Sequence, residues 1–270
     1  MKHVVNLSGG ACSFWGADRV LAQPDVRRDD VTLLFADTLI EDKQLYKFND
    51  WTAEYFGIPI TRVSLEMTPW ELFRKEGMIG NDRAPICSIR LKREPLWNWV
   101  YNTYPVEVFL NQVTVYVGFD WTEVNRLDDL RAEHPQVRIE APMTEPPYWD
   151  KCKIISEMEA LVGWMPDAYK QGFPHFNCGK RCIRAGISHF VHLYHVDRPA
   201  FDEWANEEIV TNEEFRNRGI ESEFGEFSIL RDRRGGVTKP LSLKTLAARI
   251  EAGETFRKDD WGGCGCGTTN

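Results

Sequence analysis

An apolar run, a glycine turn and a helix-like segment open the chain in that order, and this order constrains the fold most. The run is His3-Val4-Val5, the turn is Asn6-Leu7-Ser8-Gly9-Gly10-Ala11-Cys12-Ser13, and the helical segment runs from Phe14 to Ala22. Two glycines let the backbone approach a bound group closely, and the N–H groups that open a helix favour an anion, most often a phosphate. The hydroxyls of Ser8 and Ser13 add donors. We therefore predict a phosphate-binding turn, with a plain strand-to-helix turn as the alternative.

Strand-like and helix-like segments then alternate as far as about residue 145. Apolar runs at 31–37, 60–65 and 113–119 are typical of buried strands, and 137–141 of an edge strand. Helical spacing covers the segments between them, which predicts an α/β fold with a Rossmann-like, doubly wound, mostly parallel sheet. Ligands bind such sheets at the carboxyl ends of the strands. The Ser8 turn, Asp37 and Gly118 to Asp120 all follow strands, so we expect one shared site.

The character of the chain changes after Glu145-Pro146-Pro147. Helical patterns at 148–161, 183–196 and 241–252 dominate, with a short strand candidate at 227–230 and a charged turn at 231–236. We divide the chain into a nucleotide-binding α/β domain at 1–147 and a helical, cysteine-bearing subdomain at 148–270. The second part is expected to end in a flexible tail that carries Cys264-Gly265-Cys266.

Composition narrows the classes of function. The 270 residues carry a net charge of −8, which argues against a broad basic surface for nucleic acid. No long apolar span or export signal is evident, so we expect a cytoplasmic protein without a membrane segment. Seven cysteines, several of them clustered, indicate metal or redox chemistry rather than disulfides in such a chain.

The glycine turn resembles a known signature. Ser8-Gly9-Gly10-Ala11-Cys12-Ser13 is similar to the pyrophosphate-loop (PP-loop) motif, Ser-Gly-Gly-x-Asp-Ser, of the adenine nucleotide alpha-hydrolase superfamily. This superfamily includes ATP pyrophosphatases, which adenylate a substrate, and phosphoadenosine phosphosulfate reductases. The resemblance implies that these residues bind ATP with Mg²⁺. Cys12 occupies the position at which the signature has an Asp. The Gly-Lys-Ser/Thr ending of the Walker loop is absent.

Two further segments resemble the reductase branch of this superfamily. Asp37-Thr38 looks like an Asp-Thr pair that follows the second strand there, and an acid at this position can bind ribose hydroxyls or magnesium. A cap for the next helix is the alternative. The second segment is Thr68 to Arg74, which resembles the stretch after the third strand. The whole chain looks like a phage-borne member of this branch, and the match is closest over residues 3–126.

Basic residues and a glycine complete the expected nucleotide site. The segment Cys87 to Leu96 is similar to a family segment in which a Cys is followed by a Lys and then by Pro-Leu. Its side chains Arg90, Lys92 and Arg93 could neutralise a triphosphate or a sulfate, although three basic residues on a helix are usually a solvated face. We assign a catalytic role to Lys92 and a nucleotide contact to Arg90. The resemblance adds nucleotide contacts from Gly118 and Asp120.

Five cysteines indicate what kind of reaction the protein catalyses. Cys178 and Cys182 lie in Asn177-Cys178-Gly179-Lys180-Arg181-Cys182, which leads into a predicted helix whose N–H groups, with Lys180 and Arg181, would lower the thiol pKa values. Cys264 and Cys266 lie in the tail, and Cys87 lies near the expected nucleotide. We interpret Cys152 as an inert thiol.

The residues leave two metal sites open. A structural zinc site would use Cys178, Cys182, Cys264 and Cys266. A 4Fe–4S cluster would use Cys87, Cys178 and Cys182, with Cys264 or an open iron as the fourth position. Spacing alone barely separates them, but relatives in the superfamily carry a cluster on comparable cysteines, and this resemblance favours iron. It leaves Cys264 or Cys266 as a nucleophile or persulfide carrier.

Other chemistry-bearing residues give weaker signals. His189, His192 and His195 are spaced by three residues, so they drift around a helix, and packing or surface roles are expected. Arg231, Arg233 and Arg234, beside two glycines, could hold a phosphate or could belong to a charged turn.

The sequence-based hypothesis is an ATP-dependent sulfurtransferase. It would adenylate a substrate oxygen and replace that oxygen with sulfur from a cluster or a cysteine persulfide. One alternative is a thiol enzyme similar to phosphoadenosine or adenosine phosphosulfate reductases, and another is a zinc-stabilised nucleotide-binding module. Expected partners are a nucleotide, a nucleic-acid or small-molecule acceptor, and a sulfur-donor protein such as a cysteine desulfurase.

Overall fold

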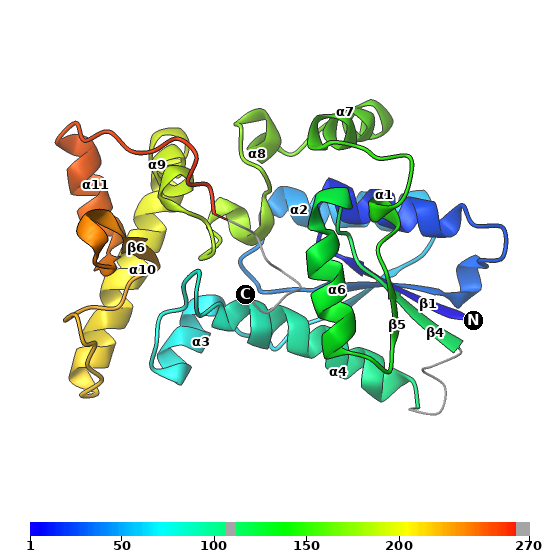
Figure 1. The fold of residues 1–270 in the computed structure, drawn as a ribbon, viewed down its shortest axis with the longest axis horizontal. Helices are drawn as coiled ribbons and strands as arrows, with labels where there is room; N and C mark the ends of the chain where they lie inside the picture. Colours follow the sequence, from blue (N-terminus) through cyan, green and yellow to red (C-terminus); the bar gives the residue numbers. More distant parts are fainter. Residues whose placement is uncertain (106–111, 263–270) are drawn as a thin grey trace.

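Five parallel strands form the centre of the molecule in the computed structural model, which describes residues 1–105 and 112–262 (Figure 1). The strand order is β3-β2-β1-β4-β5. β1 pairs with β2 along one edge, where Val5 lies beside Leu33, and with β4 along the other, where Val4 lies beside Val115. The strands are β1 (Lys2–Leu7), β2 (Val31–Ala36), β3 (Ile60–Val63), β4 (Val113–Tyr116) and β5 (Arg138–Glu140).

Helices cover both faces of this sheet (Figure 1). Because side chains alternate along a strand, Val5 and Leu33 enter one core with Phe14 of α1 and Phe48 of α2. Their neighbours Val4 and Leu34 enter a second core with residues of α4 and α6. The strands are therefore apolar on both faces, as in other doubly wound sheets. The α/β, Rossmann-like prediction is confirmed.

The helices alternate with strands and then follow one another. Those that accompany the sheet are α1 (Ala11–Leu21), α2 (Lys43–Phe56), α3 (Pro69–Glu76), α4 (Glu94–Thr103) and α6 (Val124–Glu133). A six-residue π-helix, η2 (Ser88–Arg93), leads directly into α4. The later helices are α7 (Lys151–Val162), α8 (Asp167–Lys170), α9 (Ile187–Val196), α10 (Arg198–Asn217) and α11 (Leu243–Glu251). A short hairpin, β6 (Leu230–Asp232) and β7 (Lys239–Leu241), lies between α10 and α11.

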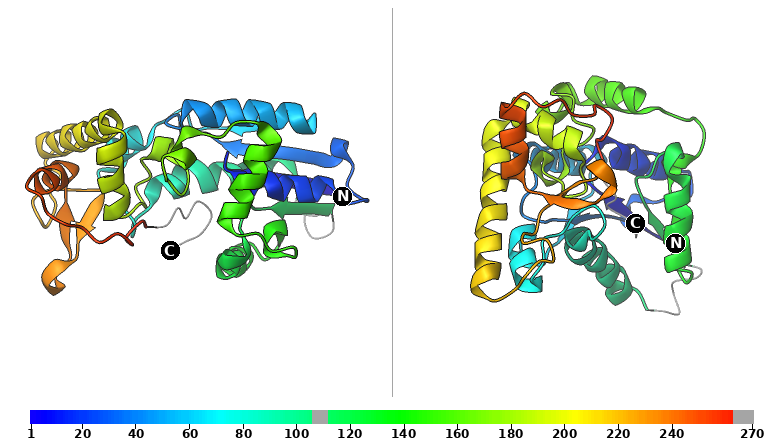
Figure 2. Two further views of the ribbon diagram at one scale, coloured as in Figure 1. Left: turned by 90° about the horizontal axis from the view of Figure 1, so that it is seen from above. Right: turned by 60° about the vertical axis from the view of Figure 1, so that its left-hand side comes forward.

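α9, α10, α11 and the hairpin gather at one end of the molecule (Figure 2). They share a core with the sheet half, since Trp204 of α10 meets Trp70 of α3 with ring centroids 5.2 Å apart. α7 instead packs on the sheet side, where its Ile154 joins the core around Phe14. Within residues 1–105 and 112–262, no helix combines the length and apolar character needed to cross a membrane.

Two expected elements begin later than the sequence pattern indicated. The helix expected at 183–196 starts at Ile187, because Gly186 is its N-cap and the residues before it form a turn. The strand expected at 227–230 starts only at Leu230. The expected edge strand is observed as β5 at the edge of the sheet.

Candidate functional site

The turn between β1 and α1 is held by its own serines. The Ser8 N–H donates to Ser13 Oγ across 3.1 Å, and Ser13 Oγ donates to the Gly10 carbonyl across 2.8 Å. Gly9 has φ +77°, and a Cβ there would lie 2.5 Å from Leu45 Cγ, so only glycine fits. The first turn of α1 contains no acidic residue. The turn thus presents a helix N-terminus without an acidic residue of its own, which suits an anion. The Ser8 and Ser13 hydroxyls donate within the turn.

Gly118, which follows the neighbouring strand β4, packs against the start of α1. A Cβ on Gly118 would lie 2.6 Å from the Ser13 Cα, so the chain after β4 packs directly on the start of α1. The chain leaves β1 toward β2 on one side of the sheet and returns as β4 on the other. This is the switch point at which doubly wound sheets bind ligands.

A cavity of about 210 Å³ opens at these strand ends. Its cationic side chains are Lys92, Arg93, Arg126 and Lys151, and its carboxylate is Glu123, which pairs with Arg126. A small-molecule site usually measures about 300–1000 Å³, so this space would hold phosphate groups rather than a whole nucleotide. The other polar residues that line it include Asn6, Ser8, Ser13, His175 and Asn177. We call it the phosphate cavity.

Lys92 reaches the phosphate cavity from the π-helix η2. π-helices are rare, and those that occur are frequently found at functional sites. The Lys92 ammonium donates to Glu41 Oε1 across 2.8 Å, and both side chains are largely buried. The other Glu41 oxygen accepts the backbone N–H of Cys178. Glu41 therefore links the π-helix to the cysteine segment.

Three cysteines line a second, smaller cavity. Cys87, Cys178 and Cys182 surround a space of about 10 Å³, together with Lys92 and Trp204. Burial, with the neighbouring Cys178 thiol, raises the pKa of Cys87 to about 12, so this thiol is protonated at neutral pH. Cys178 has φ +55°, and the two residues after it are also left-handed. We call this space the thiol cavity.

The two cavities share a wall. Lys92 lines both of them, and Asn177 of the phosphate cavity is followed directly by Cys178 of the thiol cavity. The structure thus brings together Ser8, Ser13, Gly118 and Lys92 on one side with Cys87, Cys178 and Cys182 on the other. Cys264 and Cys266 lie outside the described residues.

The geometry of the described residues bears on both metal hypotheses. Among residues 1–105 and 112–262, no three histidine, cysteine or carboxylate side chains are placed so that they could hold one metal ion. A cavity needs about 10–15 Å³ to hold one water molecule, so the thiol cavity has room for a single small sphere. As the described residues are arranged, this space does not fit a four-iron cluster.

Asp37 and Asp120 do not line the phosphate cavity, because local groups engage their carboxylates. Asp37 accepts hydrogen bonds from the Tyr46 hydroxyl and from Arg62 Nε, both at 2.7 Å, and from the Leu39 N–H. Asp120 caps the short helix that follows it by accepting the Thr122 N–H across 2.8 Å. Both acids therefore organise their own loops. The helix-cap alternative for Asp37 is wrong, because Asp42 is the N-cap of α2.

Arg90 and Cys12 also point away from the cavity. Arg90 is exposed and pairs with Glu94 across 2.8 Å, so it is the solvated face of the segment, whereas Lys92 and Arg93 reach the cavity. The Cys12 side chain packs against the core around Phe14. Burial and the nearby Asp120 raise the pKa of the Cys12 thiol to about 12.

The turn that precedes α9 differs from the arrangement that was expected to activate the thiols of Cys178 and Cys182. Cys178 and Cys182 do not lie at the N-terminus of this helix, because α9 begins only at Ile187 and Ile183 still belongs to the turn. Lys180 pairs with Asp197 across 2.7 Å, and Arg181 pairs with Glu203. The two cations expected to activate the thiols are therefore partly neutralised by local acids.

The histidines have the expected packing and surface roles. His189 is fully buried and donates from Nε2 to the Lys180 carbonyl across 2.6 Å, and His192 donates in the same way to the Gln171 carbonyl. His195 is exposed near the end of α9. Two of the three thus fix the loops that precede α9.

Sequence reasoning missed the acid that joins the two cavities. Thr38-x-x-Glu41 has the spacing of a capping box, and the Thr38 hydroxyl does donate to Glu41 Oε1 across 3.0 Å. That spacing was the available signal for a buried, bonded Glu41. Lys151, His175 and Asn177 had no comparable signal, because their approach to the cavity depends on how distant segments pack.

Comparison with known proteins does not assign a family. No family model matches the chain, and no curated protein or solved structure matches it significantly.

Proposed function

We propose that the protein is an ATP-dependent sulfurtransferase of the PP-loop type. The observation that carries this proposal is the position of Lys92 on the wall of both the phosphate cavity and the thiol cavity. A phosphate site explains the first cavity, and sulfur chemistry explains the second. An enzyme that activates a substrate with ATP and then delivers sulfur to it needs the two side by side.

In the first step, the Ser8 turn would hold the pyrophosphate portion of ATP, with Mg²⁺ supplied alongside it. A substrate oxygen attacks the α-phosphorus, the bond to pyrophosphate breaks, and the substrate becomes adenylated. Lys92 would donate hydrogen bonds to the phosphate oxygens. Because Glu41 balances its charge, the cationic side chains that line the cavity would together stabilise the negative charge that develops there.

In the second step, sulfur would arrive as a persulfide on one of the cysteines, loaded by a sulfur-donor protein. The terminal sulfur attacks the activated carbon, a carbon–sulfur bond forms, and AMP leaves with the former substrate oxygen. A second cysteine thiolate then attacks the Sγ atom of the first cysteine, and the bond between that Sγ and the transferred sulfur breaks. This releases the thiolated product and leaves a disulfide, which an external thiol must reduce before the next cycle.

Cys264 or Cys266 would supply one of these thiols. Gly262, the last described residue, forms a bridge with Ala185, three residues after Cys182. Cys264 is two residues further along the sequence, and two residues of chain span at most about 7 Å. Zinc remains the metal alternative that involves the same cysteines.

The test is a product assay with Mg²⁺-ATP, a persulfide donor, and either bulk tRNA or a DNA oligonucleotide as acceptor. The proposal predicts AMP and pyrophosphate in equal amounts, with no ADP. Formation of ADP and phosphate, or failure of the protein to bind any adenine nucleotide, would contradict it. Release of sulfite from adenosine phosphosulfate, without ATP cleavage, would instead identify a reductase.

A further inference from the structure

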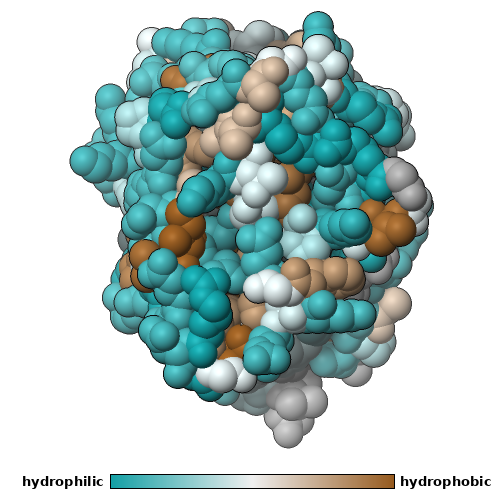
Figure 3. Space-filling model, turned by 90° about the vertical axis from the view of Figure 1, so that its left-hand side faces the viewer, coloured by the Kyte–Doolittle hydropathy of each residue, from teal (hydrophilic) through white to brown (hydrophobic). Residues whose placement is uncertain are grey.

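A large cavity lies away from the sheet, at the end of the molecule formed by α9, α11 and the β6–β7 hairpin. Its volume is about 650 Å³, which is in the range of small-molecule sites. The outer face at this end of the molecule is mainly hydrophilic (Figure 3). We call this space the arginine cavity, because six arginines line it: Arg184, Arg231, Arg233, Arg234, Arg249 and Arg257.

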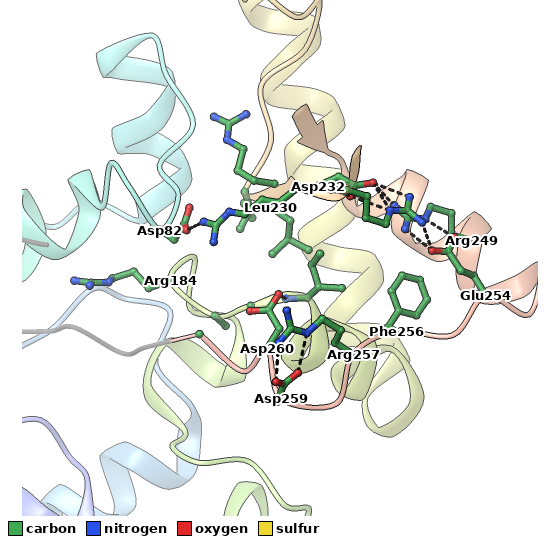
Figure 4. Close-up of a pocket in the computed structure, with 18 of the residues that line it drawn as sticks. Asp82, Arg184, Leu230, Asp232, Arg249, Glu254, Phe256, Arg257, Asp259 and Asp260 are labelled. Atoms are coloured by element: carbon green, nitrogen blue, oxygen red, sulfur yellow. Dashed lines mark hydrogen bonds and ion pairs between the residues drawn. The ribbon is translucent and has the colours of Figure 1, made fainter. Parts of the chain in front are cut away.

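Part of this charge forms a fixed scaffold. Arg249 is 16 % exposed and pairs with both Asp232 and Glu254. Arg234 pairs with the same two acids. Asp232, Arg249 and Glu254 lie together at one end of the cavity, with Arg184 and Asp82 at the other and Leu230 between them (Figure 4). The two arginines and the two acids of this scaffold neutralise one another.

Three further arginines, Arg231, Arg233 and Arg257, can turn to a ligand at little cost. Within the described parts of the chain, Arg231 takes part in no ion pair. Arg233 pairs with Asp82, and Arg257 with Asp259, but all four of these side chains are at least 38 % exposed. Exposed pairs of this kind contribute little, whereas an arginine that binds a phosphate forms strong, often bidentate, charge-assisted hydrogen bonds.

The rest of the cavity lining suits an aromatic ring that carries hydrogen-bond donors. Ile187, Ile229, Leu230 and Phe256 give the cavity an apolar lining. Asp259 and Asp260 also line the cavity. Their carboxylates can accept hydrogen bonds from exocyclic amino groups. A phosphate, an apolar ring face and amino donors occur together in a nucleotide.

The arginine cavity also adjoins the thiol cavity through the chain. Cys182 and Ile183 line the thiol cavity, and the next residues, Arg184 to Ile187, line the arginine cavity. The Ala185 N–H donates to the Cys182 carbonyl across 2.9 Å, so this loop is a tight turn. The end of the arginine cavity at Arg184 therefore adjoins the cysteine segment.

We propose that the arginine cavity binds the acceptor, and that the acceptor is a nucleotide unit, either free or in a single strand. Assignment as the acceptor rests on the proposed function, but the binding itself does not. Arg231 and Arg233 would bind the phosphate, and the apolar lining would hold the base.

Binding of fluorescent nucleoside monophosphates and of a short single-stranded oligonucleotide to the full chain tests this proposal. The Arg231→Gln/Arg233→Gln variant is expected to bind the preferred probe at least about tenfold more weakly, since each lost phosphate contact removes a charge-assisted bond. The matched control is Arg198→Gln, which removes an exposed arginine of α10 outside the cavity. Thermal unfolding of each variant shows whether it is folded.

The outcomes separate this proposal from the proposed function. Wild-type affinity in the double variant, or no binding of any probe at millimolar concentration, would overturn the cavity assignment. A Gly118→Ala variant, which disturbs the phosphate cavity, should still bind the probe. If the wild type binds probes through Arg231 and Arg233 but never cleaves ATP, the proposed function fails and the nucleotide site stands. Preference for the oligonucleotide over all monophosphates would identify a strand as the source of the nucleotide.

Discussion

Lys92 and Glu41 form an ion pair of 2.8 Å between the two cavities at the carboxyl edge of the sheet. The Glu41 side chain is fully buried, and that of Lys92 is 11 % exposed. The same carboxylate accepts the Cys178 N–H and the Thr38 hydroxyl. A buried pair of this kind costs desolvation energy and is often neutral for stability. Its position between the cavities indicates that it holds Lys92 in place.

Substitution of Glu41 should destabilise the protein. Glu41→Gln keeps the shape but removes the carboxylate that pairs with the buried Lys92 ammonium, and removal of one partner of a buried pair costs about 3–5 kcal/mol. Urea denaturation measures this change in the free energy of unfolding. Asp202→Asn, which breaks the exposed pair with Arg198, is the control and should cost less than about 1 kcal/mol. Equal losses in the two variants would contradict the account of Glu41.

Gly118 should be far less tolerant of a methyl group than Gly16. In Gly118→Ala the new Cβ meets the Ser13 backbone at 2.6 Å, so α1 and the chain after β4 must move apart. We expect a loss of about 1–3 kcal/mol, as for other overpacked sites, together with weaker ATP binding. Gly16→Ala places its Cβ in open space within α1 and should stabilise the protein by up to about 1 kcal/mol. Denaturation and nucleotide titration of both variants check this, and a harmless Gly118→Ala would refute the close packing.

Glu208 should make stability depend on pH. Its carboxyl group is buried in α10 and accepts the N–H groups of Ile229 and Leu243 across 2.9 and 2.6 Å. Burial raises its pKa from 4.5 to about 8, so the folded protein binds more protons than the unfolded chain between these values. Stability from this group is therefore complete below about pH 4.5 and is lost as pH rises through about 8.

Glu208→Gln should remove this pH dependence, because the amide does not titrate. The variant should be less stable than the wild type near pH 5, since its NH₂ group cannot accept one of the two N–H bonds. The difference should shrink or reverse near pH 9. Unfolding free energies at both pH values test this, with the exposed Glu213→Gln of the same helix as control. Parallel profiles for Glu208→Gln and the wild type would show that Glu208 does not titrate as expected.

The cysteines should differ sharply in function. Cys178→Ser is expected to abolish sulfur transfer while AMP formation continues, because adenylation in the proposed reaction uses only the phosphate cavity. Cys12→Ser and Cys152→Ser should retain both activities, since Cys12 packs into the core and Cys152 is exposed on α7. Separate assays of AMP and of thiolated acceptor distinguish the steps. Retention of sulfur transfer by Cys178→Ser would remove this residue from the reaction.

Local patterns predicted the sheet half well. The runs around Val5, Leu33 and Val115 are apolar on both faces, and only a sheet covered on both sides buries them in this way. Gly9 and Gly118 were recognisable because their positions follow strands, where a close approach of backbones is expected. These features depend on residues that are near one another in the sequence.

Contacts between segments that are distant in the sequence could not be predicted from local patterns. Asp37 followed a strand as expected, but Arg62 and Tyr46 come from other elements and occupy its carboxylate. Cys178 and Cys182 were expected at a helix N-terminus, whereas the actual turn depends on Gly186 and on its backbone contact with Trp261. Arg90 and Lys92 differ in exposure because residues two apart lie on opposite sides of a helix, and the packing of η2 on the rest of the protein decides which side is buried.

The most direct test of the account is whether nucleotide binding alters the thiols across the shared wall. Alkylation of each cysteine is followed by mass spectrometry, with and without a non-hydrolysable ATP analogue and Mg²⁺. Because Lys92 lines both cavities, the analogue should change the alkylation rates of Cys178 and Cys182 several-fold and leave that of Cys152 unchanged. Identical rates for all three cysteines with and without saturating analogue would contradict the claim that the two cavities form one site.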